Sequence, residues 1–346
     1  MKAWRIPEHG GPDALQLETG LPDPEPGPGQ VRVRVRAAAL NHLDLWVRRG
    51  VPGHPFPLPM IPGSDVAGEV DRTGPGVAGW NRGDPVLIAP GFGCGACPRC
   101  LAGDDNLCRS YGILGETRDG ACAEFVVVPA THVTRMPANL QPTAAAALPL
   151  VSLTAWHMLV AKAGVRPGDW VLVHAGASGV GSMAIQIAKL HGAQVITTIA
   201  TPGKADRVRP LGADHLLVST EVDVAKEVRR LTSKRGVDIV VDHLGGEPFQ
   251  KALACLARGG RLVNCGATVD AKVGCDLRIV FFKNLAILGS TMGRRGEVET
   301  TIELARQGRL QPVVDRVFPM NELPQAHAYL EERRAVGKVV VEGFGV

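Results

Sequence analysis

The segment Trp170-Val171-Leu172-Val173-His174-Ala175-Gly176-Ala177-Ser178-Gly179-Val180-Gly181 decides the fold of this chain. Its apolar beginning predicts a short buried strand, and its glycines predict a tight turn that leads into a helix. One face of that helix is marked by apolar residues at helical spacing, namely Val180, Met183, Ala184, Ile187 and Ala188. Glycines in such a turn let the backbone approach a pyrophosphate, whose charge then faces the unpaired N–H groups of the helix. The spacing here, G-x-x-G-x-G, is a variant, so a tight turn without a ligand is the alternative interpretation.

Further apolar runs follow this segment at intervals that leave room for helices. They are Gln194–Ile199, His215–Val218, Val237–Asp242, Arg261–Cys265 and Leu285–Gly289. Strands that alternate with amphipathic helices predict a parallel, doubly wound sheet with right-handed crossovers. Together with the first strand, these runs predict the α/β dinucleotide-binding fold known as the Rossmann fold.

The residues after the second predicted strand bear on the choice of dinucleotide. NAD-selective sites usually have an acidic residue there, which binds the ribose 2′-hydroxyl. Here no acid occurs before Asp206, whereas Thr201, Lys204 and Arg207 could bind a 2′-phosphate. Each charge-assisted hydrogen bond contributes about 1.5–3 kcal/mol, so one or two of them decide the preference. The sequence favours NADP, with NAD as the alternative; Lys204 could also be an ordinary solvated lysine.

The first 140 residues and the last fifty have a different, β-rich texture. Val31–Arg36 alternates apolar and basic residues, which predicts a strand whose arginine face is solvated. More strands are predicted at Asp65–Asp71, Pro85–Ile88 and Ala123–Val128. The tail predicts helices at Glu297–Gln307 and Glu322–Arg333 and a last strand at Lys338–Glu342, which we expect to return to the first domain.

Four cysteines lie close together in this N-terminal part, with the spacing C-x2-C-x2-C-x7-C: Cys94, Cys97, Cys100 and Cys108. Four thiolates close a tetrahedral zinc site and leave no coordination position for a substrate. An iron–sulfur cluster uses the same ligands and is the weaker alternative. We therefore predict one structural zinc ion, whose binding contributes roughly 10–16 kcal/mol in small zinc peptides.

Composition excludes several classes of protein. The chain has 346 residues and a net charge of +4, and its basic residues are dispersed, so neither nucleic acid nor a membrane surface is an expected partner. The N-terminus lacks the apolar core of a secretory signal. The uncharged stretch Ala144–Ala161 is interrupted by Pro149 and His157, which favours a buried helix over a membrane span. We expect a cytoplasmic enzyme that acts on a small molecule.

Together these motifs resemble the medium-chain dehydrogenase/reductase superfamily, which includes zinc-type alcohol dehydrogenases and NADPH:quinone oxidoreductases. The four-cysteine lobe, Pro167–Val173 before the glycine turn and Leu211–Asp214 carry the resemblance. It implies a GroES-like catalytic domain at 1–152 with a zinc lobe at 93–109, a Rossmann NADP-binding domain at 153–291, and a return to the catalytic domain at 292–346. It also implies a homodimer or homotetramer.

The same resemblance locates a catalytic zinc site that this chain lacks. Alcohol dehydrogenases have Cys-His-x-Asp where this chain has Asn41-His42-Leu43-Asp44. They have Gly-His-Glu where it has Gly63-Ser64-Asp65, and a third cysteine near Val151–Leu153, where it has none. An amide and a lone carboxylate make a poor zinc site, so we predict no catalytic zinc.

In the quinone oxidoreductase branch, the resemblance places Asn41 near the nicotinamide, where its amide can donate to the cofactor or the substrate oxygen. Asp44 is either a second catalytic group or a buried carboxylate that holds the loop. No tyrosine stands where a general acid is expected, because the chain has only Tyr111 and Tyr329. The cofactor is expected to contact the glycine turn and residues that follow other strands: Gly176, Ser178, Gly179, Val180, Gly181, Thr154, Thr201, Lys204, Asn264, Cys265, Gly266, Ser290, Thr291 and Met292.

The expected activity is hydride transfer from NADPH to a quinone, an α,β-unsaturated carbonyl compound or an enoyl thioester. In these acceptors the negative charge that develops spreads over a conjugated system, so less help from a metal is needed. The first alternative is a zinc-type alcohol or aldehyde dehydrogenase. The second alternative is a nucleotide-binding protein with little turnover.

Overall fold

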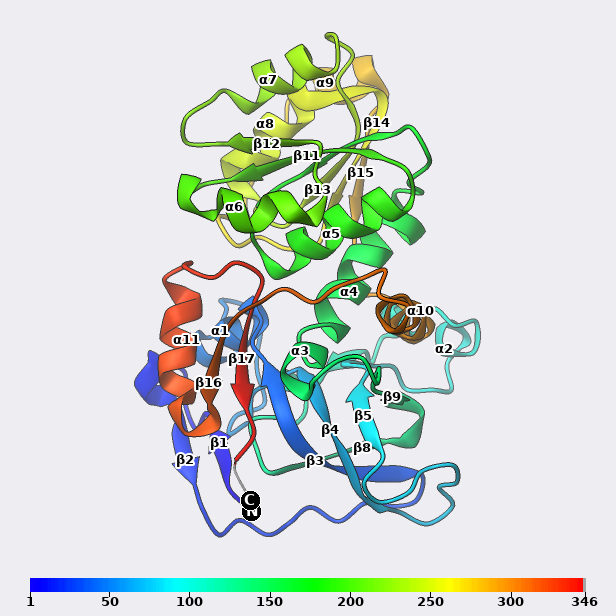
Figure 1. The fold of residues 1–346 in the computed structure, drawn as a ribbon, viewed down its shortest axis with the longest axis vertical. Helices are drawn as coiled ribbons and strands as arrows, with labels where there is room; N and C mark the ends of the chain where they lie inside the picture. The colour runs from blue at the N-terminus through cyan, green and yellow to red at the C-terminus, as the bar shows by residue number, and fades with distance from the viewer. Residues whose placement is uncertain (345–346) are drawn as a thin grey trace. The chain divides into compact units, whose positions relative to one another are not determined.

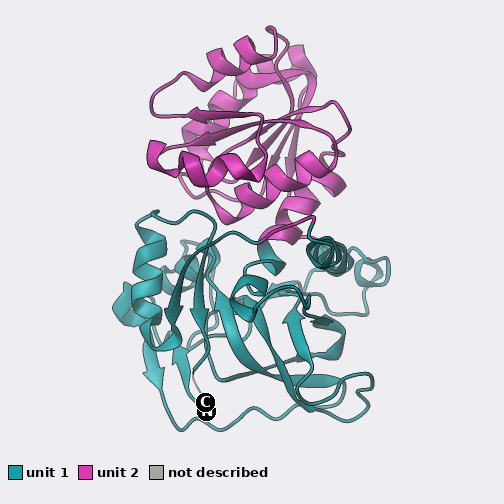
Figure 2. Ribbon diagram, viewed as in Figure 1, with its two compact units in different colours: residues 1–150, 294–308, 312–346 teal, residues 151–293, 309–311 magenta. Residues whose placement is uncertain are grey.

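The structure of the protein is a computed structural model, and it describes residues 1–344. The chain forms two compact units (Figures 1 and 2). Unit 1 comprises residues 1–150, 294–308 and the segment from 312 to the last described residue; unit 2 comprises 151–293 and 309–311. The sequence-based boundaries were 152/153 and 291/292.

Unit 2 contains a sheet in which every pairing is parallel, in the order β12-β11-β10-β13-β14-β15. Its strands are β10 (Trp170–Val173), β11 (Gln194–Ile199), β12 (His215–Val218), β13 (Val237–Asp242), β14 (Leu256–Asn264) and β15 (Ala286–Gly289). From β10 the chain proceeds outward to β11 and β12, and then crosses to β13 on the other side of β10. This reversal makes a topological switch point, and ligands of such sheets bind outside the carboxyl ends of the strands there.

Helices cover both faces of this sheet, with α5 and α6 on one side and α7, α8 and α9 on the other (Figure 1). Their bounds are α5 (Gly179–Leu190), α6 (Ala205–Val208), α7 (Val224–Leu231), α8 (Gly246–Cys255) and α9 (Leu277–Lys283), with short 3-10 turns at Pro202–Lys204 (η5) and Arg209–Leu211 (η6). The covering helices bury the apolar strands, among them Leu172, Ile196 and Val240, in one core. The doubly wound Rossmann fold predicted from the sequence is therefore confirmed.

Unit 1 is built on a mostly antiparallel sheet with the order β16-β17-β3-β4-β5-β9, in which β8 also pairs with β3. Its strands are β1 (Ala3–Arg5), β2 (Gln16–Glu18), β3 (Gln30–Ala39), β4 (Asp65–Thr73), β5 (Pro85–Ile88), β6 (Gly91–Phe92), β7 (Gly112–Ile113), β8 (Phe125–Pro129), β9 (Val133–Arg135), β16 (Val314–Pro319) and β17 (Lys338–Glu342). Its helices are α1 (His42–Arg49), α2 (Pro98–Leu101), α3 (Pro142–Ala145), α10 (Arg295–Arg306) and α11 (Leu323–Glu331), with 3-10 turns η1 (Pro12–Ala14), η2 (Asp105–Leu107), η3 (Ala130–His132) and η7 (Met320–Glu322). Strand β17 pairs antiparallel with β3, so the C-terminal segment completes the N-terminal sheet.

The arginine face of β3 differs from the sequence-based expectation. Arg32 is only 5% exposed, because its Nε donates to Oδ2 of Asp71 at 2.7 Å and its guanidinium lies over the Phe125 ring. The prediction of a solvated face is therefore wrong at Arg32. The sequence pattern could not show that neighbouring β4 and β8 supply an acid and an aromatic ring to this face.

The uncharged stretch forms consecutive helical turns that include α3, α4 (Pro149–Trp156) and a π-helix at His157–Lys162 (η4). Residues 142–162 are long and apolar enough to cross a membrane, but 78% of the most apolar window is buried inside the protein. This burial matches the core helix that the sequence predicted.

Candidate functional site: a four-cysteine lobe, a buried lysine cluster and a glycine turn

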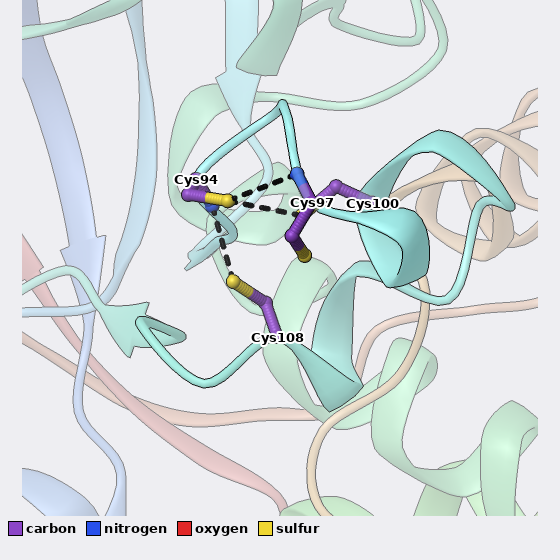
Figure 3. A group of neighbouring side chains, drawn as sticks. All are labelled: Cys94, Cys97, Cys100 and Cys108. Carbon is purple, nitrogen blue, oxygen red and sulfur yellow. Dashed lines mark hydrogen bonds between the residues drawn. The ribbon is translucent and has the colours of Figure 1, made fainter.

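The four cysteines predicted to bind zinc come together on one lobe of unit 1 (Figure 3). All four Sγ atoms lie within 4.8 Å of one another, and Sγ of Cys94 and Sγ of Cys100 are 3.9 Å apart. A tetrahedral zinc ion with Zn–S bonds of about 2.3 Å separates its sulfurs by about 3.8 Å. The four side chains therefore fit a structural zinc ion, which would order the lobe and supply no open position for chemistry.

Backbone N–H groups prepare these sulfurs for the charge of a metal-bound thiolate. Cys94 N donates to Sγ of Cys108, and Cys97 N donates to Sγ of Cys94, each at 3.4 Å. Donation from the N–H groups of Ala96 and Cys97 lowers the pKa of Cys94 to about 6. Hydrogen bonds of this kind orient the ligands of a metal and stabilise their deprotonated form.

A second group of side chains, here called the Lys338 cluster, consists of Asn41, Asp65 and Lys338. Oδ2 of Asp65 accepts from Nζ of Lys338 at 2.9 Å and from Nδ2 of Asn41 at 3.0 Å. Nζ of Lys338 also donates to Oδ1 of Asn41. Asp65 is 0% and Lys338 3% exposed, so the carboxylate and the ammonium form a buried ion pair.

The sheet explains why these residues meet. Asp65 begins β4 and pairs with Ala39 at the end of β3, while Val340 of β17 also pairs with Ala39. Continuing the second register by two residues places Lys338 opposite Asn41. The carboxyl end of β3 therefore lies beside the amino ends of its antiparallel neighbours β4 and β17. Each of the three strand ends contributes one side chain to the cluster.

Asp44 holds the backbone beside this cluster. Its carboxylate accepts from Asn41 N at 2.7 Å and from Gly63 N at 3.0 Å, so it joins the first turn of α1 to the loop before β4. Burial raises the pKa of Asp44 to about 6, although these backbone donors and Lys338 oppose the shift. Of the two roles that the sequence left open, these contacts favour the structural one; a catalytic role for Asp44 remains a prediction.

Asn41 lies at the expected edge of unit 1, but its amide is already engaged. Nδ2 donates to Asp65 and, at 3.3 Å, to the carbonyl oxygen of Ala39, while Oδ1 accepts from Lys338. Direct donation from Asn41 to a cofactor or substrate oxygen would require one of these bonds to open. That role remains a prediction.

The residues at this edge do not fit a catalytic zinc ion. Within residues 1–344, the four cysteines are the one group of at least three histidines, cysteines or acids whose ligand atoms gather closely enough to hold a metal. Ser64 and Asn41 offer neutral oxygens, and Asp65 is fully used by Lys338, Asn41 and the N–H of Leu150 at 2.8 Å. A dication here would also face the Lys338 ammonium, which repels it.

In unit 2, the glycine turn has the geometry that a pyrophosphate requires. Ser178 caps the twelve-residue helix α5, because its Oγ accepts from Gly181 N at 2.9 Å. A Cβ on Gly181 would lie 2.3 Å from the carbonyl oxygen of Ala175, and one on Gly176 would lie 2.1 Å from Oγ1 of Thr197. Only glycine allows this close passage, so the turn fits a dinucleotide, whose phosphates would bind at the N-terminus of α5.

The other predicted cofactor residues lie mostly after strands of the same parallel sheet. Thr201 and Lys204 follow β11, Asn264, Cys265 and Gly266 end or follow β14, and Ser290, Thr291 and Met292 follow β15. Since the carboxyl ends of parallel strands share one edge, the fold collects these residues on the edge where the glycine turn lies. Thr154 lies in α4, buried, with no partner for its Oγ1 in the part of the chain that is described. Cofactor contact at each of these positions remains a prediction.

Sequence reasoning missed a polar network at this edge and the whole role of Lys338. Nδ1 of His174 lies 2.8 Å from Oδ1 of Asp242, whose Oδ2 accepts from Asn264 Nδ2 at 2.6 Å. Nε2 of His243, the residue after Asp242, lies 3.0 Å from Oγ of Ser178 in the glycine turn. The sequence does contain a sign of these residues, because a charged or imidazole side chain stands at the end of an otherwise apolar strand. Lys338 shows the same pattern, since it directly precedes the apolar run Val339–Val341.

Comparisons with known proteins agree with this architecture. A family model described as an alcohol dehydrogenase GroES-like domain matches residues 27–138, and one described as a zinc-binding dehydrogenase matches residues 179–307. The NAD-dependent alcohol dehydrogenase of Saccharolobus solfataricus is 32% identical over 357 residues, which cover 99% of each chain.

Two solved structures are similar over nearly the whole chain. One, described as an NAD-dependent alcohol dehydrogenase, has a TM-score of 0.96 and 49% identity, and covers 99% of this chain and 100% of the other. Another is a 2-octenoyl-CoA carboxylase reductase in complex with NADP and 2-octenoyl-CoA; its TM-score is 0.88 at 30% identity, covering 96% of this chain and 82% of the other. The chain therefore belongs to the alcohol dehydrogenase family of the medium-chain dehydrogenase/reductase superfamily and is a nicotinamide-dependent oxidoreductase.

Proposed function

We propose that this protein is an NADPH-dependent reductase of conjugated acceptors, that is quinones, α,β-unsaturated carbonyl compounds or enoyl thioesters, and that it works without a catalytic zinc ion. The observation that carries the proposal is the Lys338 cluster. Asn41 stands where alcohol dehydrogenases are expected to have a zinc ligand, and its amide is bound by the buried Asp65–Lys338 ion pair. Alcohol oxidation depends on a Lewis acid that polarises the oxygen. Reduction of a conjugated acceptor depends on it less, because the charge is delocalised.

The preference for NADP is supported by the residues that follow β11. That strand ends at Ile199 without an acid, and the first acid, Asp206, lies inside α6. Lys204 ends the short turn η5, where its ammonium can reach a phosphate on the adenosine ribose. The similar carboxylase reductase was solved with NADP and an enoyl thioester, which supports both the cofactor and the class of acceptor.

The second candidate is an alcohol or aldehyde dehydrogenase. It is favoured by the relative from Saccharolobus solfataricus and by the similar solved structure, both of which are described as NAD-dependent alcohol dehydrogenases. A nucleotide-binding protein with little turnover, the remaining alternative, predicts tight binding of NADPH without oxidation of it by any acceptor.

We also propose a homodimer, or a tetramer built from it, through the β15 edge of the unit 2 sheet. An edge strand offers unpaired N–H and C=O groups to a second chain. Exposed apolar side chains lie on β15 and the preceding helix α9, namely Leu277, Phe281, Phe282 and Ile287, which are 44–69% exposed. A cytoplasmic location is consistent with eight cysteines that form no disulfide bond within residues 1–344. We propose a small-molecule substrate, with neither nucleic acid nor membrane as a partner.

Zinc content and activity should be measured together on the purified full-length protein. The proposal predicts one zinc per chain by mass spectrometry, and oxidation of NADPH with quinones, enones or enoyl thioesters. Two zincs per chain together with NAD-dependent oxidation of alcohols would establish the second candidate instead.

A further inference from the structure

We propose that the buried ammonium of Lys338 is the electrophile of this enzyme: it binds the substrate oxygen that becomes negative during hydride transfer, in place of a catalytic metal ion. Asn41 and Asp65 act as positioning residues that hold it. The inference rests on the proposed function and names the group that activates its acceptor.

The hydrogen bonds of Nζ leave one of its donors available. An ammonium has three N–H donors. In the described chain, Nζ of Lys338 has two acceptors, Oδ1 of Asn41 and Oδ2 of Asp65. Asn41 is itself fixed, because its Nδ2 donates to Asp65 and to Ala39. Two of the three N–H groups of the ammonium are therefore bound within the cluster, and the third can donate to one further oxygen.

Burial of the Asp65–Lys338 ion pair has an energetic cost. Withdrawing an ammonium and a carboxylate from water costs several kcal/mol each, and replacing a buried ion pair with apolar side chains is often neutral or stabilising. Lys338 directly precedes three buried valines, Val339 to Val341, where an apolar residue would continue the strand. The pair is thus poorly explained as a stabilising device, whereas preorganised charge in a water-poor site is a common means of catalysis.

Asp44 and His42 are ionisable side chains that interact with Lys338. Asp44 lies near enough to interact with both Lys338 and Asp65, and its pKa is raised to about 6, mainly by burial. His42, the first residue of α1, has its pKa lowered to about 4 by burial, Arg333, Lys338 and Arg49, so the imidazole is neutral at pH 7. The cation that pairs with Asp65 in the cluster is therefore Lys338 and not His42.

Neither tyrosine is suited to the same task. Tyr111 lies shortly after the last cysteine of the lobe, and burial raises its pKa well above the ordinary value, so it is a poor acid. The hydroxyl of Tyr329 donates to Oδ2 of Asp315 at 2.7 Å. This matches the absence of a tyrosine acid at the expected position in the sequence.

The step balances without a metal. A hydride leaves C4 of the reduced nicotinamide and forms a C–H bond at the β-carbon of the acceptor, while the π electrons move to the carbonyl oxygen. The Lys338 ammonium donates a hydrogen bond to this enolate oxygen. Water then supplies a proton to the α-carbon and becomes hydroxide, which the buffer neutralises. The other products are the oxidised nicotinamide and the saturated carbonyl compound.

The test compares acceptors that differ in how much they need an electrophile. Lys338→Met keeps the length of the side chain and removes the charge. Because this change leaves Asp65 unpaired, the double variant Asp65→Asn/Lys338→Met is measured beside it. The matched control is Arg32→Met/Asp71→Asn, which removes another buried ion pair of unit 1. For each protein, kcat/KM is measured with a simple enone and with a high-potential benzoquinone, and NADPH binding is measured by fluorescence.

In both Lys338 variants we expect kcat/KM for the enone to fall 100- to 1,000-fold, which is the usual effect of removing one hydrogen-bond donor to an oxyanion. For the benzoquinone we expect kcat/KM to fall less than 10-fold. The kinetic isotope effect of C4-deuterated NADPH should rise with the enone, and NADPH affinity should stay within threefold. The ratio of kcat/KM for the enone to kcat/KM for the benzoquinone does not depend on the fraction of protein that is folded. A variant that folds poorly can therefore still be compared with the unaltered enzyme. In the control variant this ratio should not change.

An unchanged ratio in the Lys338 variants, or a loss confined to NADPH binding, would overturn the assignment of Lys338 and leave the proposed function intact. Failure of the unaltered enzyme to reduce any conjugated acceptor would overturn both. A readout independent of activity is the zinc content after dialysis against excess zinc. It should remain one per chain, and a second ion that displaces Lys338 would contradict the inference.

Discussion

Nζ of Lys338 lies 2.9 Å from Oδ2 of Asp65, although the two residues are 273 positions apart in the chain. The contact exists because β3 has β4 on one side and β17 on the other, so residues from opposite ends of unit 1 meet where β3 ends. A buried pair of this kind has a recognisable thermodynamic signature.

Lys338→Met alone is expected to lower the free energy of unfolding by about 3–5 kcal/mol, because it leaves the Asp65 carboxylate buried without its cation. The double variant Asp65→Asn/Lys338→Met should recover most of that loss. Urea denaturation of the single and double variants measures the coupling. Additive losses would mean that the two side chains do not interact energetically.

Cys100→Ala is expected to reduce the bound zinc from one per chain to none and to lower the melting temperature, because three thiolates hold the ion less well than four. The matched control is Cys275→Ser, which alters an exposed cysteine outside the lobe. Zinc retained at full occupancy by Cys100→Ala would contradict the predicted ligand set.

Lys204→Ala is expected to raise KM for NADPH about tenfold and to leave KM for NADH unchanged, since one charge-assisted hydrogen bond contributes about 1.5–3 kcal/mol. Steady-state kinetics with both cofactors checks this. Lys226→Ala, at an exposed lysine of α7, is the control. Equal effects on both cofactors would show that Lys204 does not recognise the 2′-phosphate.

Asp44→Ala is expected to lower the free energy of unfolding by about 3 kcal/mol, because the N–H groups of Asn41 and Gly63 lose a charged acceptor in a buried position. Asp13→Ala removes an exposed carboxylate of unit 1 and should have little effect. Equal stability of the two variants, measured by urea denaturation, would rule out the structural role of Asp44.

His327 should make the protein sensitive to mild acid. Its imidazole is fully buried on α11, and burial, with a smaller contribution from Arg48, lowers its pKa from 6.5 to about 3. As the pH falls below 6.5, the unfolded chain binds a proton that the folded chain does not, so folding loses stability continuously down to about pH 3. Between pH 7 and pH 5 this amounts to about 2 kcal/mol.

The variant His327→Leu should remove that part of the pH dependence, and it should not destabilise at pH 7, because neither ring nitrogen has a partner among residues 1–344. His54→Gln, at a half-exposed histidine, should leave the pH dependence unchanged. A pH profile of urea denaturation for the three proteins decides the matter.

The strands of unit 2 could be predicted because their signal is local. A run such as Trp170–Val173, most of it buried, is apolar throughout, and the turn after it brings Gly176 and Gly181 too close to neighbouring atoms for any side chain. The four-cysteine lobe was predictable for the same reason, since its ligands come from one short segment. At β14 the observed strand begins at Leu256, whereas the sequence suggested Arg261, because Gly259 and Gly260 interrupt the apolar pattern.

The sequence by itself determined that this chain alternates strands and helices around a glycine turn and carries four closely spaced cysteines, and it predicted that the usual ligands of a catalytic zinc are missing. Only the tertiary structure decided which side chains surround Asn41. Lys338 looks like one more polar residue at the start of a strand until the antiparallel pairing of β17 with β3 places it beside Asn41 and Asp65. Local pattern specifies which elements form, but the register between strands distant in sequence determines which charges share a buried space, and thus the chemistry of the site.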